Sequence, residues 1–302
     1  MSVVITEDLW WSLPTWLESR YSVFYDPLLA NDRARLLMLV KTAQALVVRN
    51  KTQVDLNLLD AAPQLKVVGR LGVGVDNIDQ SACRDRGVQV VTARGCNGDA
   101  VAEYVLASML HHARFLYRCN ADVRAGQWDR QSATGGEIGG KTLGLLGAGD
   151  IAQRVAHRAQ AFDMKVIGYD PYLAEQDAGI FLTDLDTVIG QADYLSIHVP
   201  LTAETHYLIG AQALSRMKPG AILINTARGS VVDEQALRAS LMAHPDRHAF
   251  LDVREQEPPA ANDPLYDLPN ITFTPHIAGI TYESAKRVAA HVLKEVHRVL
   301  SA

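Results

Sequence analysis

The fold is decided by residues 141–171, which read KTLGLLGAGDIAQRVAHRAQAFDMKVIGYDP. Residues 142–146 are a short apolar run of β character, and Gly147-Ala148-Gly149 then turns the chain. Apolar residues recur at helical spacing over residues 150–162, and a second β-like run covers residues 165–169. The stretch predicts a strand, a tight glycine turn, a helix and a second strand.

The glycine turn has the spacing of a dinucleotide-binding site, with Ala152 in the third glycine position. Gly147 allows the tight turn, and Gly149 lets the backbone approach a pyrophosphate. A small side chain at Ala152 keeps the helix close to the sheet. The helix N-terminus offers free N–H groups and the positive end of its dipole to the phosphates.

Asp170 follows the second strand, 18 residues beyond Ala152. A carboxylate at this point accepts hydrogen bonds from both ribose hydroxyls and repels a 2′-phosphate, which favours NAD over NADP. The alternative is a glycine turn in an α/β core that holds no ligand. The two flanking strands and the acid favour the nucleotide site.

The composition is that of an ordinary soluble globular protein, with 302 residues, 48% apolar and 21% charged. The length suggests about two domains. The net charge of −5 and the lack of a basic run argue against nucleic-acid binding. No apolar run approaches a membrane span, and residues 1–11 carry acids where a signal peptide needs basic residues.

Three cysteines, Cys83, Cys96 and Cys119, have no paired spacing. They favour a reducing cytoplasm and no structural zinc. His111 and His112 are adjacent on a predicted helix and point in different directions. A structural role is favoured for both, and we expect no metal site.

The N-terminal part of the chain alternates strands and helices. Strands are predicted at 2–6, 21–25, 45–49, 65–71 and 88–92, with helices at 33–42 and 54–62. Alternation of this kind implies parallel βαβ units, and so an α/β unit over roughly residues 1–97. It carries no dinucleotide fingerprint and is a candidate substrate or lid domain.

One long helix is predicted over residues 99–118, with Asp99 as its N-cap and a broad apolar face. Residues 121–140 are polar and glycine-rich and predict an extended loop. After the fingerprint the alternation continues, with strands at 194–199, 221–226, 249–253 and 271–274 and helices at 184–191, 211–217 and 234–243. This gives about six parallel strands in a doubly wound sheet. The last helix, residues 281–300, is expected to cross back to the first unit.

Polar side chains lie where the predicted strands end, at Asp170, His198, Thr226-Ala227-Arg228-Gly229, Asp252 and His276. Ligands bind at the carboxyl ends of the strands in an open α/β sheet. A hydride transfer to or from a hydroxy acid needs three groups. A cation must hold the substrate carboxylate, an acid/base must exchange the hydroxyl proton, and a third group must tune the pKa of that acid/base.

Arg228 fits the cation, because its planar fork pairs with a carboxylate. His276 fits the acid/base, and Glu257 fits its partner because a carboxylate favours the imidazolium. The alternatives are a surface ion pair for Arg228 and a core histidine for His276. His198 fits a structural histidine as well, and no catalytic role is assigned to it.

Eight segments in a fixed order carry a family resemblance: LKVVGRLGVGVDNID (65–79), NGDAVAE (97–103), KTLGLLGAGDIA (141–152), IGYDP (167–171), HVPLTAET (198–205), INTARGSVVDEQAL (224–237), LDVREQEP (251–258) and TPHIAG (274–279). Together they resemble the D-isomer-specific 2-hydroxyacid dehydrogenase family, and most its phosphoglycerate dehydrogenase branch.

The resemblance implies an α/β protein of two Rossmann-like domains, each a doubly wound parallel sheet, with a cleft that closes over NAD and substrate. Residues 1–97 and 280–302 would form a discontinuous catalytic domain, and residues 98–279 the NAD-binding domain. Family members are commonly homodimers built around the long helix after NGDAVAE. The C-terminal regulatory domain of many phosphoglycerate dehydrogenases is expected to be lacking.

The resemblance also implies roles for single residues. Arg228 would bind the substrate carboxylate, His276 would be the acid/base and Glu257 its partner. The remaining positions fall along the cofactor and the substrate: Gly147, Gly149, Asp150, Ile151 and Ala152 at the pyrophosphate, Asp170 at the adenosine ribose, Val199 and Pro200 at the adenine, Thr226, Ala227 and Asp252 at the nicotinamide end, Gly279 after the catalytic histidine, and Val73 and Gly74 in the loop that reaches the nicotinamide and substrate.

Two positions depart from the family pattern. Asp150 stands where an arginine or similar donor commonly helps to bind the pyrophosphate. Its carboxylate would weaken NAD binding there, unless it caps the helix and turns away. Arg254 stands where an apolar aromatic residue is usual, and no function is assigned to it.

Substrate choice depends on Arg49-Asn50-Lys51-Thr52, which with Arg70 could form a second anion site for a phosphate, sulfonate or carboxylate. Exposed charge at a strand end is the alternative. The resemblance favours a phosphoglycerate dehydrogenase-like activity, with hydroxypyruvate or glyoxylate reduction and sulfolactate oxidation as neighbours. From another class, an NADH-sensing corepressor-like binding protein shares this fold, although the chain shows no appended basic region.

Overall fold

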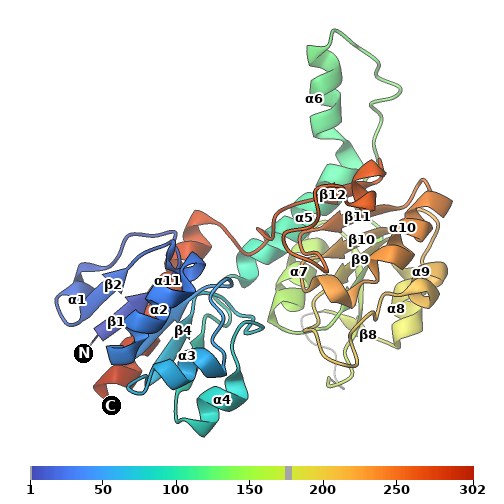
Figure 1. Ribbon diagram of the computed structural model, residues 1–302. Coiled ribbons are helices and arrows are strands. Elements are labelled where there is room, and N and C mark those ends of the chain that lie inside the picture. Colours follow the sequence, from blue (N-terminus) through green and yellow to red (C-terminus); the bar gives the residue numbers. More distant parts are fainter. Residues whose placement is uncertain (1, 174–178) are drawn as a thin grey trace. The chain divides into compact units, whose positions relative to one another are not determined.

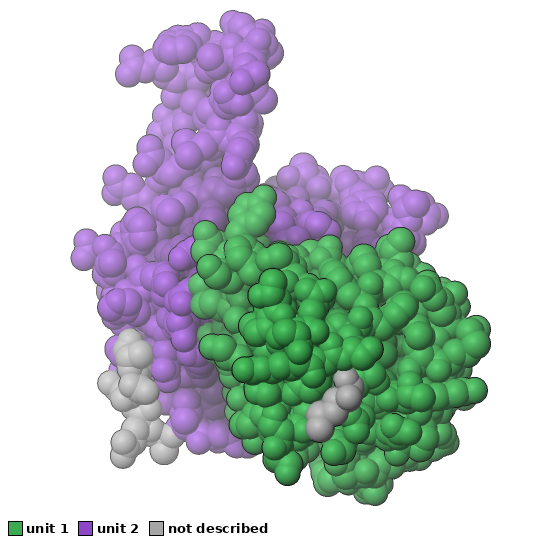
Figure 2. All heavy atoms as spheres, turned by 90° about the vertical axis from the view of Figure 1, so that its left-hand side faces the viewer, with its two compact units in different colours: residues 1–97, 280–302 green, residues 98–279 purple. Residues whose placement is uncertain are grey.

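The chain folds into two compact units. The computed structural model describes residues 2–173 and 179–302. One unit consists of Met1–Asn97 and Ile280–Ala302, and the other of Gly98–Gly279. Figure 2 shows them in green and purple. We call them unit 1 and unit 2.

Unit 1 is built on a five-stranded parallel sheet in the order β2-β1-β3-β4-β5 (Figure 1). Its strands are β1 (Ser2–Ile5), β2 (Ser22–Tyr25), β3 (Ala45–Val48), β4 (Val67–Arg70) and β5 (Gln89–Thr92). Alternate side chains of β3 enter opposite cores: Leu46 and Val48 lie in one cluster, and Ala45 and Val47 in the other. Apolar side chains therefore cover both faces, as in a doubly wound sheet.

Helices cover each side of this sheet. They are α1 (Thr15–Glu18), α2 (Arg33–Leu39), α3 (Leu56–Ala61), α4 (Gln80–Asp85) and α11 (Tyr282–Ser301), with 3-10 turns at Leu29–Asn31 and Val40–Thr42. Asp32, Asp55 and Asp79 cap α2, α3 and α4. Helix α11 begins with a capping box of Thr281 and Ser284.

Helix α11 brings the C-terminal end of the chain back onto the first sheet. A Cβ placed on Gly69 of β4 would lie 2.8 Å from methyl groups of both Val292 and Val296. The missing side chain at Gly69 therefore lets the helix approach the strand closely.

Unit 2 is built on a seven-stranded parallel sheet in the order β12-β11-β10-β9-β6-β7-β8. Its strands are β6 (Thr142–Leu146), β7 (Lys165–Tyr169), β8 (Phe181–Leu182), β9 (Tyr194–Ile197), β10 (Ile222–Asn225), β11 (His248–Leu251) and β12 (Ile271–Phe273). Neighbouring residues of β10 again face opposite cores, Ile224 in one cluster and Leu223 in the other. Two doubly wound parallel α/β sheets, predicted from the sequence, are confirmed.

The helices of unit 2 are α5 (Gly98–Arg114), α6 (Leu116–Arg124), α7 (Asp150–Gln160), α8 (Leu185–Gln191), α9 (Ala211–Arg216) and α10 (Glu234–Ala243), with 3-10 turns at Gly229–Val231 and Pro264–Asp267. Helices α5 and α7 pack side by side. A Cβ on Gly98 would lie 2.8 Å from side-chain atoms of Arg154 and Asp150. The start of α5 is thus pressed against the start of α7.

The prediction of a single helix over residues 99–118 is wrong. Phe115 has φ 50 and ψ 28, in the left-handed region, and separates α5 from α6. The Arg118 guanidinium lies 4.3 Å from the Phe115 ring centroid, which helps to offset the strain. Helix α6 has no buried residue and stands away from the sheet of its own unit (Figure 1). It also occupies the start of residues 121–140, where a loop was predicted.

Asp99 is not an N-cap, because α5 already begins at Gly98. Its carboxylate instead accepts hydrogen bonds from Arg154 (2.8 Å) and Arg158 (2.9 Å) of α7. The sequence pattern also missed the short strand β8 and the helices α1 and α4. Within residues 2–173 and 179–302, we find no helix with the length and hydropathy needed to span a membrane.

Candidate active site

The glycine turn between β6 and α7 uses each of its three small positions differently. Gly147 has φ 87, and a Cβ there would lie 2.8 Å from the carbonyl oxygen of His198. Gly149 precedes the first residue of α7, and a Cβ there would meet nothing within 4 Å. Ala152 is fully buried in the core between helix and sheet. The turn therefore leaves open space at the N-terminus of α7, which fits a pyrophosphate.

Asp170, directly after β7, is tied to this turn. Its Oδ2 accepts a hydrogen bond from the N–H of Ala148 (2.9 Å), and its Oδ1 accepts one from the N–H of Tyr172 (2.9 Å). The carboxylate is thereby fixed beside the glycine turn with lone pairs still available. This is the geometry in which an acid can accept from ribose hydroxyls.

Asp150 turns away from the glycine turn without capping α7. Its Oδ1 accepts a hydrogen bond from Nε of Arg154 (3.0 Å), one helical turn further on. Arg154 and Arg158 both donate to Asp99, so two arginines and two aspartates form one network. The anion expected to disturb the phosphate turn is therefore paired with a cation of its own helix. Ile151, beside it, packs partly buried against the core.

Side chains at the end of β9 flank the turn. His198 is hydrogen-bonded through Nε2 to the hydroxyl of Ser196 (2.9 Å), and burial lowers the pKa of its imidazole to about 4. A neutral, structural histidine results. Val199 is half-buried and Pro200 is exposed in the segment that follows.

The turn that carries Arg228 is held by a buried asparagine. The side chain of Asn225, at the end of β10, donates to the carbonyl oxygen of Arg228 (2.9 Å) and accepts from the N–H of Ala227 (3.0 Å). Arg228 donates from NH1 to the carbonyl oxygen of Ala227 (2.6 Å). Thr226, Ala227 and Arg228 are all half-buried at this strand end.

His276 and Glu257 form a direct pair. Nδ1 of His276 lies 2.8 Å from Oε2 of Glu257, and the side chains are 44% and 35% exposed. Burial of the Glu257 carboxyl disfavours its charge, but the hydrogen bond and charge of His276 outweigh this. The N–H of Arg254 and the charge of Arg228 act in the same direction, so the pKa of Glu257 falls below its usual value of 4.5.

Asp252, at the end of β11, holds the loop that carries His276. It is 1% exposed. Its carboxylate accepts from the hydroxyl of Thr274 (2.6 Å) and from the N–H groups of Ile277 (2.7 Å) and Ala278 (2.8 Å). The Asp252 carbonyl accepts from the N–H of His276 (2.8 Å), whose φ of 57 is unusual outside glycine. Gly279 follows, half-buried, in the same loop.

In unit 1, Arg49 follows β3 and is stacked on Trp10, whose ring centroid is 3.6 Å from the guanidinium carbon. Its Nε and NH2 donate to the carbonyl oxygens of Asp8 (3.1 Å) and Leu9 (3.3 Å). Burial, and then the charge of Arg70, lower the pKa of Arg49 to about 10. Arg49 directly follows β3 and Arg70 ends β4, its neighbour in the sheet, so the two arginines stand at adjacent strand ends.

The backbone of residues 49–52 is held by hydrogen bonds to the carboxylate of Glu7. The two oxygens of Glu7 accept four N–H groups, those of residues 49–52, at distances of 2.9–3.2 Å. Four bonds to one carboxylate fix the loop that carries Arg49. Val73 is exposed and Gly74 half-exposed in the loop after β4.

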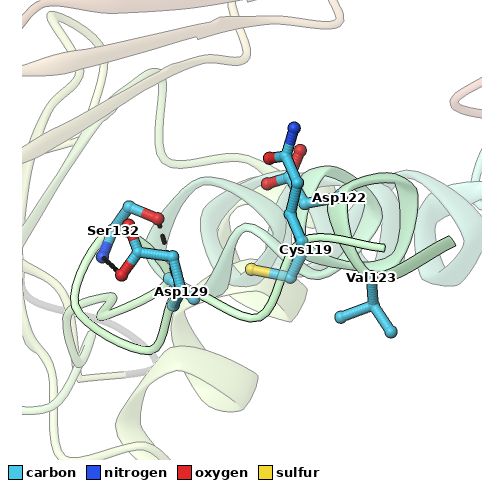
Figure 3. Close-up of a pocket in the computed structure, with 7 residues that line it drawn as sticks. Cys119, Asp122, Val123, Asp129 and Ser132 are labelled. Carbon is cyan, nitrogen blue, oxygen red and sulfur yellow. Dashed lines mark hydrogen bonds between the residues drawn. The ribbon is translucent and has the colours of Figure 1, made fainter. Parts of the chain in front are cut away.

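A hollow beside α6 lies apart from these residues (Figure 3). It is lined by Cys119, Asp122, Val123, Gln127, Asp129, Ser132 and Ala133. It includes neither the glycine turn nor His276, so it is not the candidate active site. Across the two described ranges of the chain, no three His, Cys, Asp or Glu side chains are grouped so that they could hold a metal ion.

Comparison with known proteins decides the family. Residues 106–278 match the NAD binding domain of the D-isomer specific 2-hydroxyacid dehydrogenases. The chain is 46% identical over 291 residues to an (S)-sulfolactate dehydrogenase of Chromohalobacter salexigens, covering 94% of this chain and 93% of that one. The chain belongs to the D-isomer specific 2-hydroxyacid dehydrogenase family.

Two further relatives show how the family varies. A D-3-phosphoglycerate dehydrogenase of Archaeoglobus fulgidus is 41% identical over 88% of this chain, which spans 51% of that protein's length. A D-lactate dehydrogenase of Aquifex aeolicus, solved with NAD and lactic acid, is 30% identical with a TM-score of 0.84 over 99% of this chain and 95% of that one. The family and the NAD cofactor predicted from the motifs are confirmed, and the protein is an oxidoreductase of this family.

Several residues that hold the candidate residues within each unit were not assigned from the sequence. Tyr104 of α5 donates to or accepts from Thr274 (2.6 Å) and so extends the Asp252 network, but nothing in its helical surroundings indicated this. Trp10 supports Arg49 from a loop with no recognisable motif. Arg254 was noted only as a departure from the family pattern, and that departure was the one available signal.

Proposed function

We propose that this dehydrogenase transfers a hydride between NAD and a small D-2-hydroxy acid, with Arg228, Glu257 and His276 as the reacting residues. The observation that carries the proposal is the His276–Glu257 pair at 2.8 Å. It belongs to the same unit as the glycine turn and Asp170. An acid/base pair and a nucleotide turn at strand ends of one sheet support this reaction class.

The side chains divide the chemistry between them. When bound, the cofactor would supply the redox chemistry, as hydride acceptor in its oxidised form (NAD) and as hydride donor in its reduced form (NADH). His276 donates a hydrogen bond from Nδ1 to the Glu257 carboxylate, which leaves Nε2 to exchange the proton of the substrate oxygen. Glu257 fixes the orientation of the His276 ring. The Arg228 guanidinium suits the substrate carboxylate and polarises the neighbouring carbonyl.

The cofactor would lie along the strand ends of unit 2. The open space at Gly149 and the N-terminus of α7 fit its pyrophosphate, and Asp170 fits the ribose hydroxyls. The other residues proposed to contact it are Gly147, Asp150, Ile151, Ala152, Val199, Pro200, Thr226, Ala227, Arg228, Asp252, His276 and Gly279. We accordingly propose unit 2 as the NAD-binding domain and unit 1 as the substrate-binding domain.

The substrate is proposed to carry a second anion. Arg49 and Arg70 stand at adjacent strand ends of unit 1, where like charges repel, and a sulfonate or phosphate would relieve that repulsion. Among the relatives, the sulfolactate dehydrogenase is 46% identical and the phosphoglycerate dehydrogenase 41% identical to this chain, which spans 93% and 51% of their respective lengths. Sulfolactate and 3-phosphoglycerate both carry a second anionic group and are the leading candidates, and Val73 and Gly74 are proposed to contact the substrate. Hydroxypyruvate and glyoxylate would lack the second anion.

We also propose a homodimer. Helix α6 and the loop after it expose large apolar side chains: Leu116 at 65%, Tyr117 at 75%, Val123 at 50% and Trp128 at 79%. So much exposed apolar surface on one projecting element favours a protein partner, and a second copy is the simplest. The three unpaired cysteines support a cytoplasmic location.

The decisive experiment is NADH oxidation with a panel of keto acids. Sulfopyruvate and 3-phosphohydroxypyruvate should be reduced with a higher kcat/KM than hydroxypyruvate, glyoxylate or pyruvate. Arg49→Met should raise KM for the two dianionic acids by about 10-fold or more, as expected for a lost charge-assisted contact. The same change should alter KM for hydroxypyruvate much less.

Two outcomes would overturn parts of the proposal. Faster reduction of pyruvate or glyoxylate would refute the second anion site and leave the reaction class intact. NADH binding without oxidation by any acid would refute the enzyme proposal and favour an NADH-sensing binding protein.

A further inference from the structure

Arg254 is a buried cation in the loop between β11 and the Glu257–His276 pair. Its side chain is 5% exposed. It donates through Nε and NH2 to the two oxygens of Glu234 (2.8 and 2.9 Å), and through NH2 to Asp263 (2.7 Å). The Phe273 ring centroid lies 4.8 Å from the guanidinium carbon. Burial disfavours the charge, but the two carboxylates outweigh it and raise the pKa of Arg254.

The same acid holds the backbone of this loop. Glu234, the first residue of α10, also accepts from the N–H of Glu255 (2.9 Å), and its own N–H donates to the Glu255 carboxylate (2.8 Å). Residues 254–258 form neither helix nor strand. Side-chain contacts to α10 therefore take the place of ladder hydrogen bonds in fixing this segment.

Arg254 is connected to the acid/base pair through its own backbone. Its N–H donates to Oε1 of Glu257 (3.0 Å), and Oε2 of Glu257 contacts Nδ1 of His276 (2.8 Å). The two carboxylate oxygens of Glu257 are thus held from opposite sides. The position of the Arg254 N–H therefore determines the position of the Glu257 carboxylate.

We propose that Arg254 is a positioning residue for the acid/base pair: its clamp on Glu234 and Asp263 fixes the loop whose N–H orients Glu257 towards His276. The inference rests on the proposed function of Glu257 and His276. An aromatic side chain could fill the same space beside Phe273, but it could not make three directional bonds to two carboxylates. Burying these charged groups costs desolvation free energy, but their hydrogen bonds fix the orientation of the loop.

The test compares Arg254→Met with Arg254→Lys and Glu257→Gln in the full-length protein with NADH. Arg254→Met should lower kcat by about 10- to 100-fold, as a displacement near 1 Å in a reacting group does. KM for the keto acid and Kd for NADH should stay within about 2-fold, because neither site is touched. Arg254→Lys should restore part of kcat, since it keeps the charge and loses the fork.

The pH dependence of kcat separates positioning from general loss of structure. Arg254→Met should move the pH profile in the same direction as Glu257→Gln. In the Glu257→Gln background it should have little further effect on kcat, because both changes act on one pair. Arg216→Met, which breaks the surface pair with Asp186, is the matched control and should leave kcat and the profile unchanged.

Each result bears on the inference. An unchanged pH profile in Arg254→Met, or a full additional loss of kcat in the Glu257→Gln background, would overturn it. If Arg254→Met does not fold, Asp263→Asn removes one arm of the clamp and must show the same shift in smaller measure, or the inference fails. Near-normal turnover of Glu257→Gln itself would refute the proposed function, a result distinct from the other two.

Discussion

The backbone of Arg254 lies directly against Gly229. A Cβ placed on Gly229 would be 1.9 Å from the carbonyl carbon of Arg254 and 2.0 Å from its carbonyl oxygen. Gly229 follows Arg228, and Arg254 precedes the Glu257 loop. The turn that presents the cation and the loop that presents the carboxylate are therefore in contact at a point where no side chain fits.

Gly229→Ala should for that reason disturb both stability and turnover. The two backbone segments must separate, and overpacking of this kind costs about 1–3 kcal/mol in the free energy of unfolding. Urea denaturation and NADH oxidation measure the two effects. Gly190→Ala in α8 is the control: its Cβ would lie 3.7 Å from the nearest atom, and we expect a gain of about 0.5–1 kcal/mol. Equal stability of the two variants would contradict the contact.

Asp170→Ala should weaken NADH more than NADPH. In the native protein the N–H groups of Ala148 and Tyr172 hold this carboxylate. Removing it would remove both the hydrogen bonds to the ribose hydroxyls and the repulsion of a 2′-phosphate. We expect Kd for NADH to rise roughly 10- to 100-fold, as for the loss of charge-assisted hydrogen bonds. Fluorescence titration with both cofactors measures this, and Asp186→Ala on α8 serves as the control. An unchanged ratio of the two Kd values would refute the ribose role.

Asp150 and Arg154 should have opposite effects on cofactor affinity. Removing the anion with Asp150→Ala should lower Kd for NADH by about 2- to 5-fold at low salt, the size of a charge effect at a helix terminus. Arg154→Met leaves Asp150 without the partner seen at 3.0 Å and should raise Kd. Both effects should shrink as salt is added. A higher Kd for Asp150→Ala would show that the carboxylate assists binding.

His276→Ala should abolish turnover while NADH still binds. In the proposed mechanism the His276 imidazole exchanges a proton with the substrate oxygen through Nε2, because its Nδ1 is hydrogen-bonded to Glu257. We expect kcat to fall by about 100- to 10,000-fold, the usual contribution of a general acid/base. Single-turnover absorbance and NADH fluorescence separate chemistry from binding. Near-normal kcat would remove His276 from the mechanism.

Much of the fold could be predicted because local pattern and tertiary structure agree in this chain. The strand, glycine turn and helix around Gly147 have both the right period and the right small residues. The break at Phe115 could not be predicted, because neither glycine nor proline marks it and the apolar spacing continues. Only the contacts of its ring with Arg118 and with His112 show how a left-handed phenylalanine is accommodated.

The candidate site shows the same division. Arg228, Glu257 and His276 could be proposed from motifs, because each follows a strand and each has a defined chemical role. The residues that hold them, Asn225, Asp252 and Glu234, could not be predicted in these roles. Their hydrogen bonds depend on three-dimensional contacts that no sequence spacing encodes. Asp150 illustrates the limit well: the sequence allowed either capping or repulsion, and the structure shows an ion pair with Arg154.

The stability of unit 2 should fall as the pH is lowered from about 6.5 to about 4, in part through His248. Burial, and then the charges of His112 and His111, lower the pKa of His248 from 6.5 to about 4. In that window the unfolded chain binds a proton that the folded protein excludes, so acid favours unfolding. His248 is only half-buried, and we expect it to account for about 1–3 kcal/mol of the loss.

His248→Gln tests this directly. Glutamine can keep the hydrogen bond that His248 makes with Thr272 (2.9 Å) but cannot take up a proton. Its free energy of unfolding, from urea denaturation at a series of pH values, should therefore decrease less steeply than that of the wild type between pH 6.5 and 4. Below about pH 4 the two curves should run parallel, because the native His248 is then protonated as well. Curves parallel throughout the window would show that His248 does not carry the effect.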